Sequence, residues 1–261
     1  MIRIMFGSAF AALALAQAAP AWADEVDDSL DTKSCSEADR AFDEGRHPAD
    51  VLRFVGVETG DTVADFMAGG GYYSALLADL VGKKGAVYAI NPTRFYNAQE
   101  WAQRVAAHGN IRNMAVDPRA MLLAPGSVDM ILTHLNFHDL YWESERFGFP
   151  RLDVEGVLAN WFAAVKPGDH VIVIDHVGPT GDAREVTEAV HRIAPENVVA
   201  VMAQAGFVLE AQSDVLQRSN DDLSKNVFEE SVRGKTDRFM MKFQKPDVRW
   251  TVNSCVSYNY P

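Results

Sequence analysis

An acidic residue followed by three consecutive glycines is the segment of this chain best suited to bind a ligand. Asp65 ends a β-type apolar run, Gly69, Gly70 and Gly71 follow, and a helix-like segment begins at Tyr73. Glycines let the backbone turn sharply and approach a ligand closely, because no Cβ stands in the way. Open α/β sheets bind ligands at such a place, outside the carboxyl end of a strand. An ordinary β–α turn has the same pattern, so later segments must decide between the two.

Histidines beside carboxylates follow two later apolar runs. Histidine suits proton transfer because its unperturbed pKa lies near neutrality, and a neighbouring carboxylate can orient the ring. His138 is therefore predicted to be a base, with Asp139 orienting it or binding a cationic substrate. The predicted catalytic set is His138, Asp139, His176 and His191. The structural alternative for several of them is to cap loops or to bond backbone carbonyls.

No metal site is predicted. His134 and His138 lie four residues apart, a spacing that aligns side chains on a helix, but the preceding run is typical of a strand. The chain contains no HExxH pattern and no CxxC pair. Metal binding stays a minor alternative, because histidines and aspartates that converge in the fold could also serve as ligands.

Apolar runs alternate with helix-like segments along most of the chain, which favours a mostly parallel sheet covered on both faces. The expected strands span residues 62–67, 86–90, 111–116, 128–135, 170–177, 207–216 and 238–244. The expected helices span residues 48–54, 73–81, 98–108, 154–165 and 185–205. A polar stretch without a helical pattern separates the last two strands, so the final strand is expected to run antiparallel to its neighbours.

The N-terminal residues have the layout of a secretory signal peptide. Arg3 precedes an almost wholly apolar stretch over residues 4–19, and residues 21–23 (AWA) form an A-x-A cleavage site before Asp24. The apolar stretch is shorter than the roughly 20 residues that a membrane span needs. We therefore expect a periplasmic or secreted mature chain beginning at Asp24, with no stable membrane insertion. An uncleaved anchor is the alternative.

One α/β domain is expected after the signal peptide. The expected organisation is a signal peptide at 1–23, an acidic leader at 24–40, the domain at 41–245 and a C-terminal tail at 246–261. The net charge of −12 lacks the basic character of nucleic-acid-binding proteins. A small neutral or cationic substrate is therefore expected, unless a basic pocket forms locally.

Two cysteines, Cys35 and Cys255, lie near opposite ends of the mature chain. In an oxidising compartment such a pair can form a disulfide. Two unpaired thiols, or a bond between molecules, are the alternatives.

Five ordered segments resemble class I S-adenosylmethionine-dependent methyltransferases, and more closely a bacterial group of predicted methyltransferases, some of them exported. The segments are residues 46–52 (RHPADVL), 65–74, 136–140 (NFHDL), 166–168 with 175–176, and 191–192 with 205–207. The resemblance covers about residues 41–245. It implies a Rossmann-like α/β fold with a mostly parallel seven-stranded sheet, helices on both faces, and S-adenosylmethionine as cofactor.

The resemblance also implies a set of cofactor-binding residues. Asp65 and the glycines would cradle the methionine part, and Asp117 would lie near the adenine amino group. The implied set is Asp65, Ala68, Gly69, Gly70, Gly71, Tyr72, Asn91, Asp117 and Asn136. Asp65 could instead cap the next helix. Asp117 could instead start the turn before Pro118. Tyr72 and Tyr73 could offer cation–π attraction to a sulfonium, or serve in the core.

Two positions depart from the family pattern. Met67 occupies the place of the usual first glycine and is expected to narrow the floor of the pocket. Asn91 replaces the acidic residue that normally holds the ribose hydroxyls. A neutral amide makes weaker bonds than a carboxylate, so cofactor binding is expected to weaken by about 1–2 kcal/mol.

Three functions fit these residues. The prediction is an exported methyltransferase that acts on a small molecule. The alternative is a methyltransferase-fold protein that has lost catalysis and binds a small ligand, because S-adenosylmethionine is made in the cytoplasm. The minor alternative is a nicotinamide (NAD)-dependent oxidoreductase, since residues 69–74 fall one residue short of GxGxxG. Ser74 at the third glycine and Asn91 at the ribose position count against it.

Overall fold

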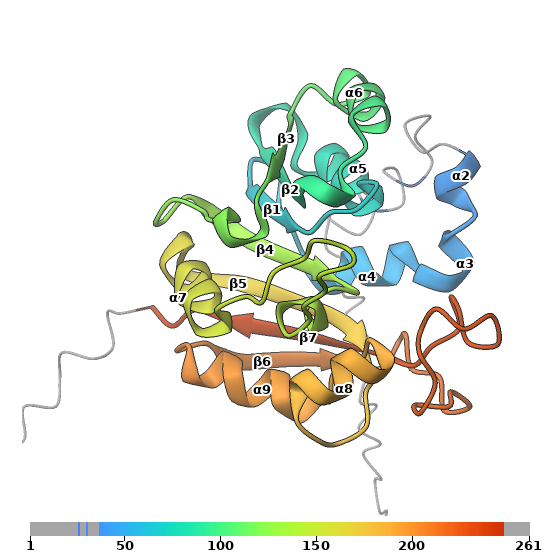
Figure 1. The fold of residues 1–261 in the computed structure, drawn as a ribbon. Coiled ribbons are helices and arrows are strands. Elements are labelled where there is room, and N and C mark those ends of the chain that lie inside the picture. The colour runs from blue at the N-terminus through green and yellow to red at the C-terminus, as the bar shows by residue number, and fades with distance from the viewer. Residues whose placement is uncertain (1–25, 27–29, 31–36, 248–261) are drawn as a thin grey trace, which may run out of the picture.

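The computed structural model describes residues 26, 30 and 37–247. Within them, seven strands form one sheet in the order β3-β2-β1-β4-β5-β7-β6 (Figure 1). The strands are β1 (Thr62–Phe66), β2 (Ala86–Pro92), β3 (Ile111–Val116), β4 (Val128–His134), β5 (Val165–His176), β6 (Val208–Ser213) and β7 (Arg238–Gln244). β7 runs antiparallel to β5 and β6, whereas the other pairings are parallel. The mostly parallel sheet with an antiparallel final strand is confirmed.

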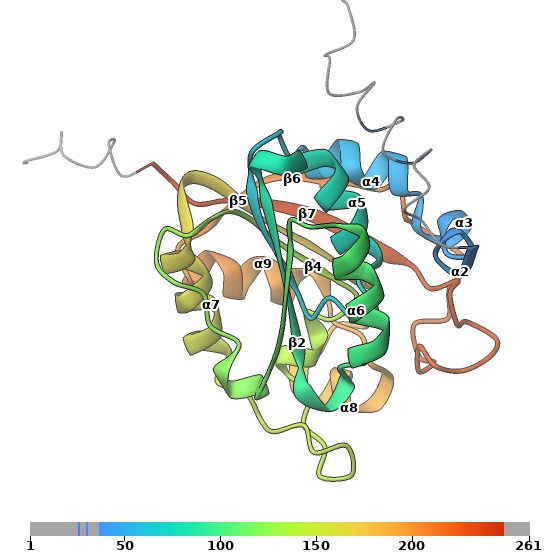
Figure 2. The same cartoon turned by 90° about the horizontal axis from the view of Figure 1, so that it is seen from above.

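Helices cover both faces of the sheet. The described helices are α2 (Glu37–Arg40), α3 (Asp43–Arg46), α4 (Pro48–Val55), α5 (Tyr72–Val81), α6 (Ala98–Ala107), α7 (Val154–Ala164), α8 (Ala183–Val190) and α9 (Pro195–Gln204), with short 3-10 turns η1 (Gly82–Lys84), η2 (Thr93–Phe95), η3 (Pro118–Ala120) and η4 (His138–Leu140). Figure 2 shows α4, α5 and α6 on one face and α7 and α9 on the other. Leu76 and Trp101 are buried in the first layer, and Trp161 and Met202 in the second. Two apolar cores therefore hold the sheet between them.

One helix of the sequence analysis is wrong. Residues 185–205 form two helices, because α8 ends at Val190 and α9 begins at Pro195. His191 between them has a left-handed backbone, with φ 51°. Proline lacks an N–H and its ring clashes with the preceding turn, so it is tolerated at a helix start but not inside one. The break places His191 at a corner near the end of β5 rather than within a helix.

The connection between β6 and β7 extends away from the sheet and lies beside α3 (Figures 1 and 2). Arg238 at the start of β7 donates from Nη1 to the carbonyl oxygen of Gly45 at 2.8 Å. A buried ion pair between Arg192 and Asp221, with Nη1–Oδ2 at 2.6 Å, ties the same connection to the segment after α8. These contacts hold distant parts of the chain around the carboxyl ends of β4 and β5.

Several expectations fall on other parts of the chain. The signal peptide at 1–23, Cys35, Cys255 and most of the leader and tail lie outside the described residues. Among the described residues, no helix combines the length and apolar character that crossing a bilayer requires.

Candidate functional site

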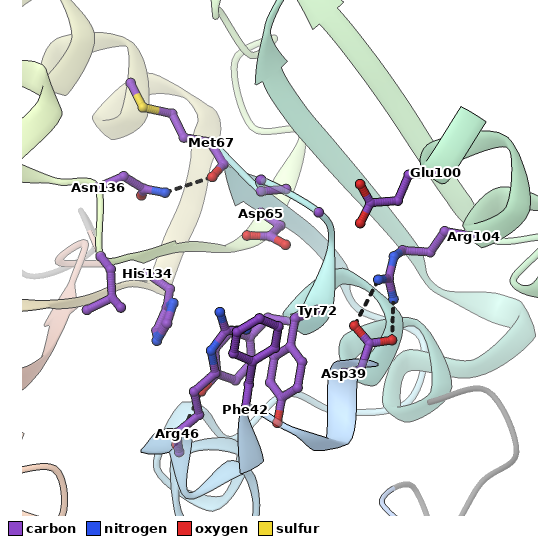
Figure 3. A pocket seen from close by; sticks show the side chains of 15 residues that line it. Asp39, Phe42, Arg46, Asp65, Met67, Tyr72, Glu100, Arg104, His134 and Asn136 are labelled. Atoms are coloured by element: carbon purple, nitrogen blue, oxygen red, sulfur yellow. Dashed lines mark hydrogen bonds and ion pairs between the residues drawn. The ribbon is translucent and has the colours of Figure 1, made fainter. Parts of the chain in front are cut away.

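A cavity of about 400 Å³ opens at the carboxyl ends of β1 and β4, beside the glycine turn into α5 (Figure 3). We call it the loop cavity. Six of the nine predicted cofactor-binding residues are among the described residues that line it: Asp65, Ala68, Gly69, Gly70, Tyr72 and Asn136. Cavities of roughly 300–1,000 Å³ hold small organic ligands. The local sequence signal therefore located a real hollow.

Asp65 supplies a buried negative charge to this cavity. Its side chain points into the hollow (Figure 3) and the residue is only 3% exposed. The Ser74 hydroxyl in the first turn of α5 donates to Oδ2 at 2.5 Å. Burial raises the pKa of Asp65 to about 6, although the Ser74 hydroxyl and the Arg46 guanidinium act in the opposite direction. At neutral pH the carboxylate is ionised, and it forms no ion pair within the described chain.

The backbone around the glycines fits a close approach of a ligand. Gly69 has φ 56° and would meet nothing within 4 Å if it carried a Cβ, so its face is open. A Cβ on Gly70 would lie 2.6 Å from the Glu100 carboxylate, and one on Gly71 would lie 2.6 Å from the Trp101 ring. Gly71 thus serves packing against α6, while Gly69 and Gly70 face the cavity.

Two larger residues share the strained backbone of this site. Met67 has φ 55° and Leu135 has φ 61°, and both line the loop cavity. A left-handed backbone costs a residue with a side chain about 1–2 kcal/mol. Asn136 donates from Nδ2 to the Met67 carbonyl oxygen at 2.7 Å, which joins the two turns. Strain of this kind gathers at functional sites, where the surrounding structure enforces it.

Seven residues that line the loop cavity were not predicted to lie there: Asp39, Phe42, Arg46, Glu100, Arg104, His134 and Leu135. Arg104 pairs with Asp39 at 3.0 Å between Nη2 and Oδ1. The first three come from residues 37–46, part of which was assigned to an exposed leader. Apart from Arg46, which begins the resembling segment 46–52, this stretch carries no motif, and its contacts with α5 and α6 bring it to the cavity.

The guanidinium of Arg46 lies over the ring of Tyr72, one of the two tyrosines that could have made a cation–π contact with a sulfonium. Its guanidinium carbon lies 4.2 Å from the Phe42 ring centroid and 4.4 Å from that of Tyr72 (Figure 3). Tyr73 lies farther away, at 6.0 Å. Burial lowers the pKa of Arg46 from its ordinary value. These tyrosines therefore hold a cation of the chain itself.

Asn91 and Asp117 do not reach the loop cavity. Asn91 is 1% exposed, and its Nδ2 is buried without a hydrogen-bond partner. Asp117 is exposed and accepts from the Arg119 backbone N–H at 2.9 Å, which is the turn role named as its alternative. The Arg119 hydrogen bonds lower the pKa of Asp117. Glu100 is the carboxylate that instead faces the glycine turn.

The four predicted catalytic residues lie together at the ends of β4 and β5. The His138 ring centroid is 5.9 Å from that of His176 and 5.8 Å from that of His191. Asp139 Oδ1 lies 3.5 Å from His138 Nε2. The fully buried Asp175 binds His138 twice, at 2.8 Å from Nδ1 and at 2.8 Å from the backbone N–H.

The carboxylates around His138 control its proton. Burial alone would lower the pKa of His138, but Asp175 and Asp139 outweigh it and raise the pKa to about 9. Burial lowers the pKa of His176, whose Nδ1 lies 2.7 Å from the Thr236 hydroxyl. His138 is therefore protonated at neutral pH and His176 is neutral.

The same cluster offers ligand atoms for a metal ion, which the sequence analysis kept only as a minor alternative. One ligand atom each from His138, Asp139 and His191 lies within 4.8 Å of the others. Metal-binding histidines usually donate their second ring nitrogen to a carboxylate, as His138 does to Asp175.

His134 is a further imidazole, and it faces the loop cavity directly (Figure 3). Its ring lies 4.6 Å from that of Tyr73, and Nε2 is buried without a hydrogen-bond partner. Burial, aided by the charges of Arg46 and Arg238, lowers the pKa of His134 well below its usual value. The cavity therefore contains a neutral imidazole as well as the Asp65 carboxylate.

Several solved structures similar to this one are described as methyltransferases. A SAM-dependent methyltransferase from Aquifex aeolicus has 19% identity and a TM-score of 0.52, over 85% of this chain and 97% of that one. An S-adenosylmethionine-dependent methyltransferase from Mesorhizobium loti has 15% identity and a TM-score of 0.50, over 75% and 96%. No protein-family model and no curated protein sequence matches the chain.

The chain therefore has the class I methyltransferase fold. The same fold also carries other chemistry, since the [4+2]-cyclase SpnF is similar with a TM-score of 0.55 and 12% identity, over 83% of this chain and 86% of that one. Function must accordingly be argued from the site.

Proposed function

We propose that this protein is an S-adenosylmethionine-dependent methyltransferase that acts on a small molecule. The observation that carries the proposal is Asp65, a buried carboxylate without an ion-pair partner among the described residues, beside an open glycine turn in a cavity of about 400 Å³. A cationic ligand neutralises such a charge, and S-adenosylmethionine has both a sulfonium and an amino group. The fold favours the same reading.

The residues of the loop cavity fit this cofactor. Bound there, S-adenosylmethionine would supply a methyl group activated by a positively charged sulfur. Asp65 would hold the positive end, and Gly69 and Gly70 would let the backbone lie against the ligand. Glu100, rather than the buried Asn91, is in place to accept from ribose hydroxyls. Alignment of donor and acceptor is the main task of the chain in such a displacement.

For proton transfer we propose the cluster of His138, Asp139, His176 and His191, with His138 as the base. The pKa of His138, near 9, sets a condition on this role, because only the deprotonated ring accepts a proton. Turnover should therefore rise with pH up to about 9. His138 acts next to His176, which lines a second cavity described below.

A ligand-binding protein without catalysis is the second candidate. The observation that favours it is the contact of His138 with Asp175 and Asp139, which raises the pKa of the ring above neutrality, together with the burial of Asn91 away from the cavity. A nicotinamide cofactor is the least favoured ligand, because Ser74, whose hydroxyl donates to Asp65, stands where a dinucleotide-binding turn has its third glycine.

Calorimetric titration of the purified protein with S-adenosylmethionine, its demethylated product and NAD tests the three readings. We expect micromolar binding of the first two ligands and none of NAD. Millimolar or absent binding of both would reject the methyltransferase. Binding without consumption of S-adenosylmethionine in the presence of any acceptor, at pH 7 to 9, would favour the second candidate.

Export to the periplasm or out of the cell is a further proposal, and it rests on residues 1–23 alone. Fractionation of cells that produce the full chain, with mass measurement of the exported form, tests it. A mature form beginning at Asp24 is expected, and an intact chain held in the cytoplasm would contradict it.

A further inference from the structure

A second cavity, of about 590 Å³, adjoins the loop cavity and differs from it in charge. Phe42, Arg46 and Leu135 line both hollows, so these three residues form the partition between them. The second hollow is bounded by α3, the end of β5 and the connection between β6 and β7. We call it the basic cavity. Its position next to the loop cavity makes it the natural place for a second ligand.

Positive charge dominates the lining of the basic cavity. The cationic side chains among its described residues are Arg46, Arg218, Arg233, Lys235 and Arg238, and Glu44 is the carboxylate among them. The whole chain has a net charge of −12, so a cluster of five cationic side chains is opposite in sign to the charge of the chain as a whole. A hollow lined by one sign of charge raises the local concentration of the opposite ion.

Arg238 makes this more than a surface patch. It is only 4% exposed, and it donates to two neutral acceptors, the Gly45 carbonyl oxygen at 2.8 Å and the Thr236 hydroxyl at 3.4 Å. Within residues 37–247 it forms no ion pair. Buried charges in proteins are normally paired, because desolvation is costly. The desolvation is reflected in the pKa of Arg238, which falls to about 10.

Arg46 contributes donors from the partition. Phe42 and Tyr72 stack against its guanidinium, at 4.2 and 4.4 Å from their ring centroids. Stacking occupies the faces of the planar group and leaves the N–H donors at its edge for a carboxylate or phosphate. Leu135 and the exposed ring of Phe228 add apolar surface to the same hollow.

We propose that the basic cavity binds a small organic anion, a molecule with an apolar body and a carboxylate or phosphate group held by Arg238 and Arg46. If the proposed methyltransferase function holds, on which this step rests, that anion is the methyl acceptor. Phe42 and Leu135 of the partition offer apolar surface to that body where the basic cavity adjoins the loop cavity. The net charge of the chain predicted a neutral or cationic substrate unless a basic pocket formed locally. The basic cavity is such a pocket, so an anionic acceptor is expected instead.

Calorimetric titration of the full chain with benzoate, phenyl phosphate and the neutral isostere benzamide tests this proposal. Both anions should bind at least about tenfold more tightly than benzamide, since charge-assisted hydrogen bonds are lost with the charge. Tighter binding of phenyl phosphate would assign the site to phosphate, and tighter binding of benzoate to carboxylate. Equal affinity for benzoate and benzamide, or no binding of either anion at millimolar concentration, would overturn the proposal.

Arg238→Gln should weaken binding of the better anion about tenfold, and the exposed Lys235→Gln should weaken it less. Arg112→Gln, on the exposed surface of the distant edge strand β3, is the matched control and should change nothing. Circular dichroism verifies that each variant folds, and Lys235→Gln keeps the test valid should Arg238→Gln fail to fold. An equal loss in Arg112→Gln would show a nonspecific charge effect and reject the site.

The two proposals fail separately. Anion binding that depends on Arg238, without any S-adenosylmethionine binding, would leave the basic cavity as an anion site and reject the methyltransferase. S-adenosylmethionine binding without anion binding would reject only the basic cavity.

Discussion

Asp65 and Arg238 are both buried, both charged at neutral pH, and both without an ion-pair partner in the described chain, yet the fold keeps them in separate cavities. Placed together, each charge would offset part of the desolvation cost of the other. The partition of Phe42, Arg46 and Leu135 lies between them instead. Keeping the two opposite charges apart does not stabilise the protein, but it provides separate sites for a cationic and an anionic ligand.

Asp175 provides the contrast, because it is a buried carboxylate that has its counter-ion. It accepts from His138 Nδ1 and from the backbone N–H groups of His138 and His176, at 2.7 to 2.8 Å. Such a group is fully satisfied within the chain. We therefore expect Asp175 to position His138 and Asp65 to bind a ligand, although both are carboxylates on parallel strands.

The largest effect should follow from removing the counter-ion of Asp175. His138→Gln leaves a carboxylate buried without a charge partner, and breaking a buried pair in this way costs about 3–5 kcal/mol of unfolding free energy. The double variant His138→Gln with Asp175→Asn has no charge to bury, so it should recover much of the loss. Urea unfolding at pH 7 measures both.

The same pair predicts a pH dependence. The raised pKa of His138 means that its stabilisation is complete below about pH 6.5 and is lost as the pH rises through about 9. A nitrogen-15 NMR titration should locate this pKa with and without a chelator. Titration near pH 6.5, or a chelator-dependent spectrum that indicates a bound metal ion, would contradict the proposed protonated pair.

Asp65→Asn should have the next largest effect. Loss of the charge should weaken S-adenosylmethionine binding about tenfold to a hundredfold, the range of hydrogen bonds to charged groups. The fold should not suffer, because the amide replaces a carboxylate that burial disfavours. Calorimetry and thermal unfolding at pH 8 measure the two quantities. A variant that binds normally would place the ligand elsewhere.

Cofactor affinity should also follow the ionisation of Asp65. Because its pKa is raised to about 6, the carboxylate is mostly protonated at pH 5 and mostly ionised at pH 7. Affinity for S-adenosylmethionine should therefore rise about tenfold between these values and level off above pH 7. Ionisation of Asp65 also costs the ligand-free protein stability, so its stability should fall as the pH rises from about 3.8 to about 6 and then level off. Asp65→Asn is the control and should show a flat profile.

The sequence predicted the fold well because its signals are local. Seven apolar runs mark the seven strands, and the glycine turn after Asp65 fixes one wall of the loop cavity. The break between α8 and α9 was missed although Pro195 is visible in the sequence, because an apolar pattern runs through the whole stretch. Periodicity there outweighed the proline in the prediction.

The walls that come from distant segments were not predictable in the same way. Arg238 and Gly45 are 193 positions apart, and only the antiparallel β7 and the short α3 bring them into contact. Arg46 lies in a segment that resembled a family motif, but its stacking on Phe42 and Tyr72 has no sequence signal. The basic cavity is therefore a product of topology.

Arg46→Gln should separate the two cavities most directly, with opposite effects on their ligands. The loss of one positive charge in the partition should weaken benzoate binding about fivefold, and should leave S-adenosylmethionine binding unchanged or slightly tighter. A fivefold change corresponds to about 1 kcal/mol, which is typical of the interaction between two charges that solvent partly screens. Calorimetry with both ligands on one preparation measures this. If both affinities fell together, the substitution would have disrupted the structure of the partition rather than removed only a charge.

The smallest effect should discriminate Glu100 from Asn91 as the ribose partner. Glu100 lines the loop cavity and lies against Gly70, whereas Asn91 is buried away from it. Glu100→Gln should weaken S-adenosylmethionine binding severalfold, by about 1 kcal/mol, because a neutral amide accepts more weakly than a carboxylate. Asn91→Asp should not tighten binding, and it should lower stability because it buries a new charge. Tighter binding by Asn91→Asp would instead return the ribose to the end of β2, and the loop cavity would then have to open toward that strand when the ligand enters.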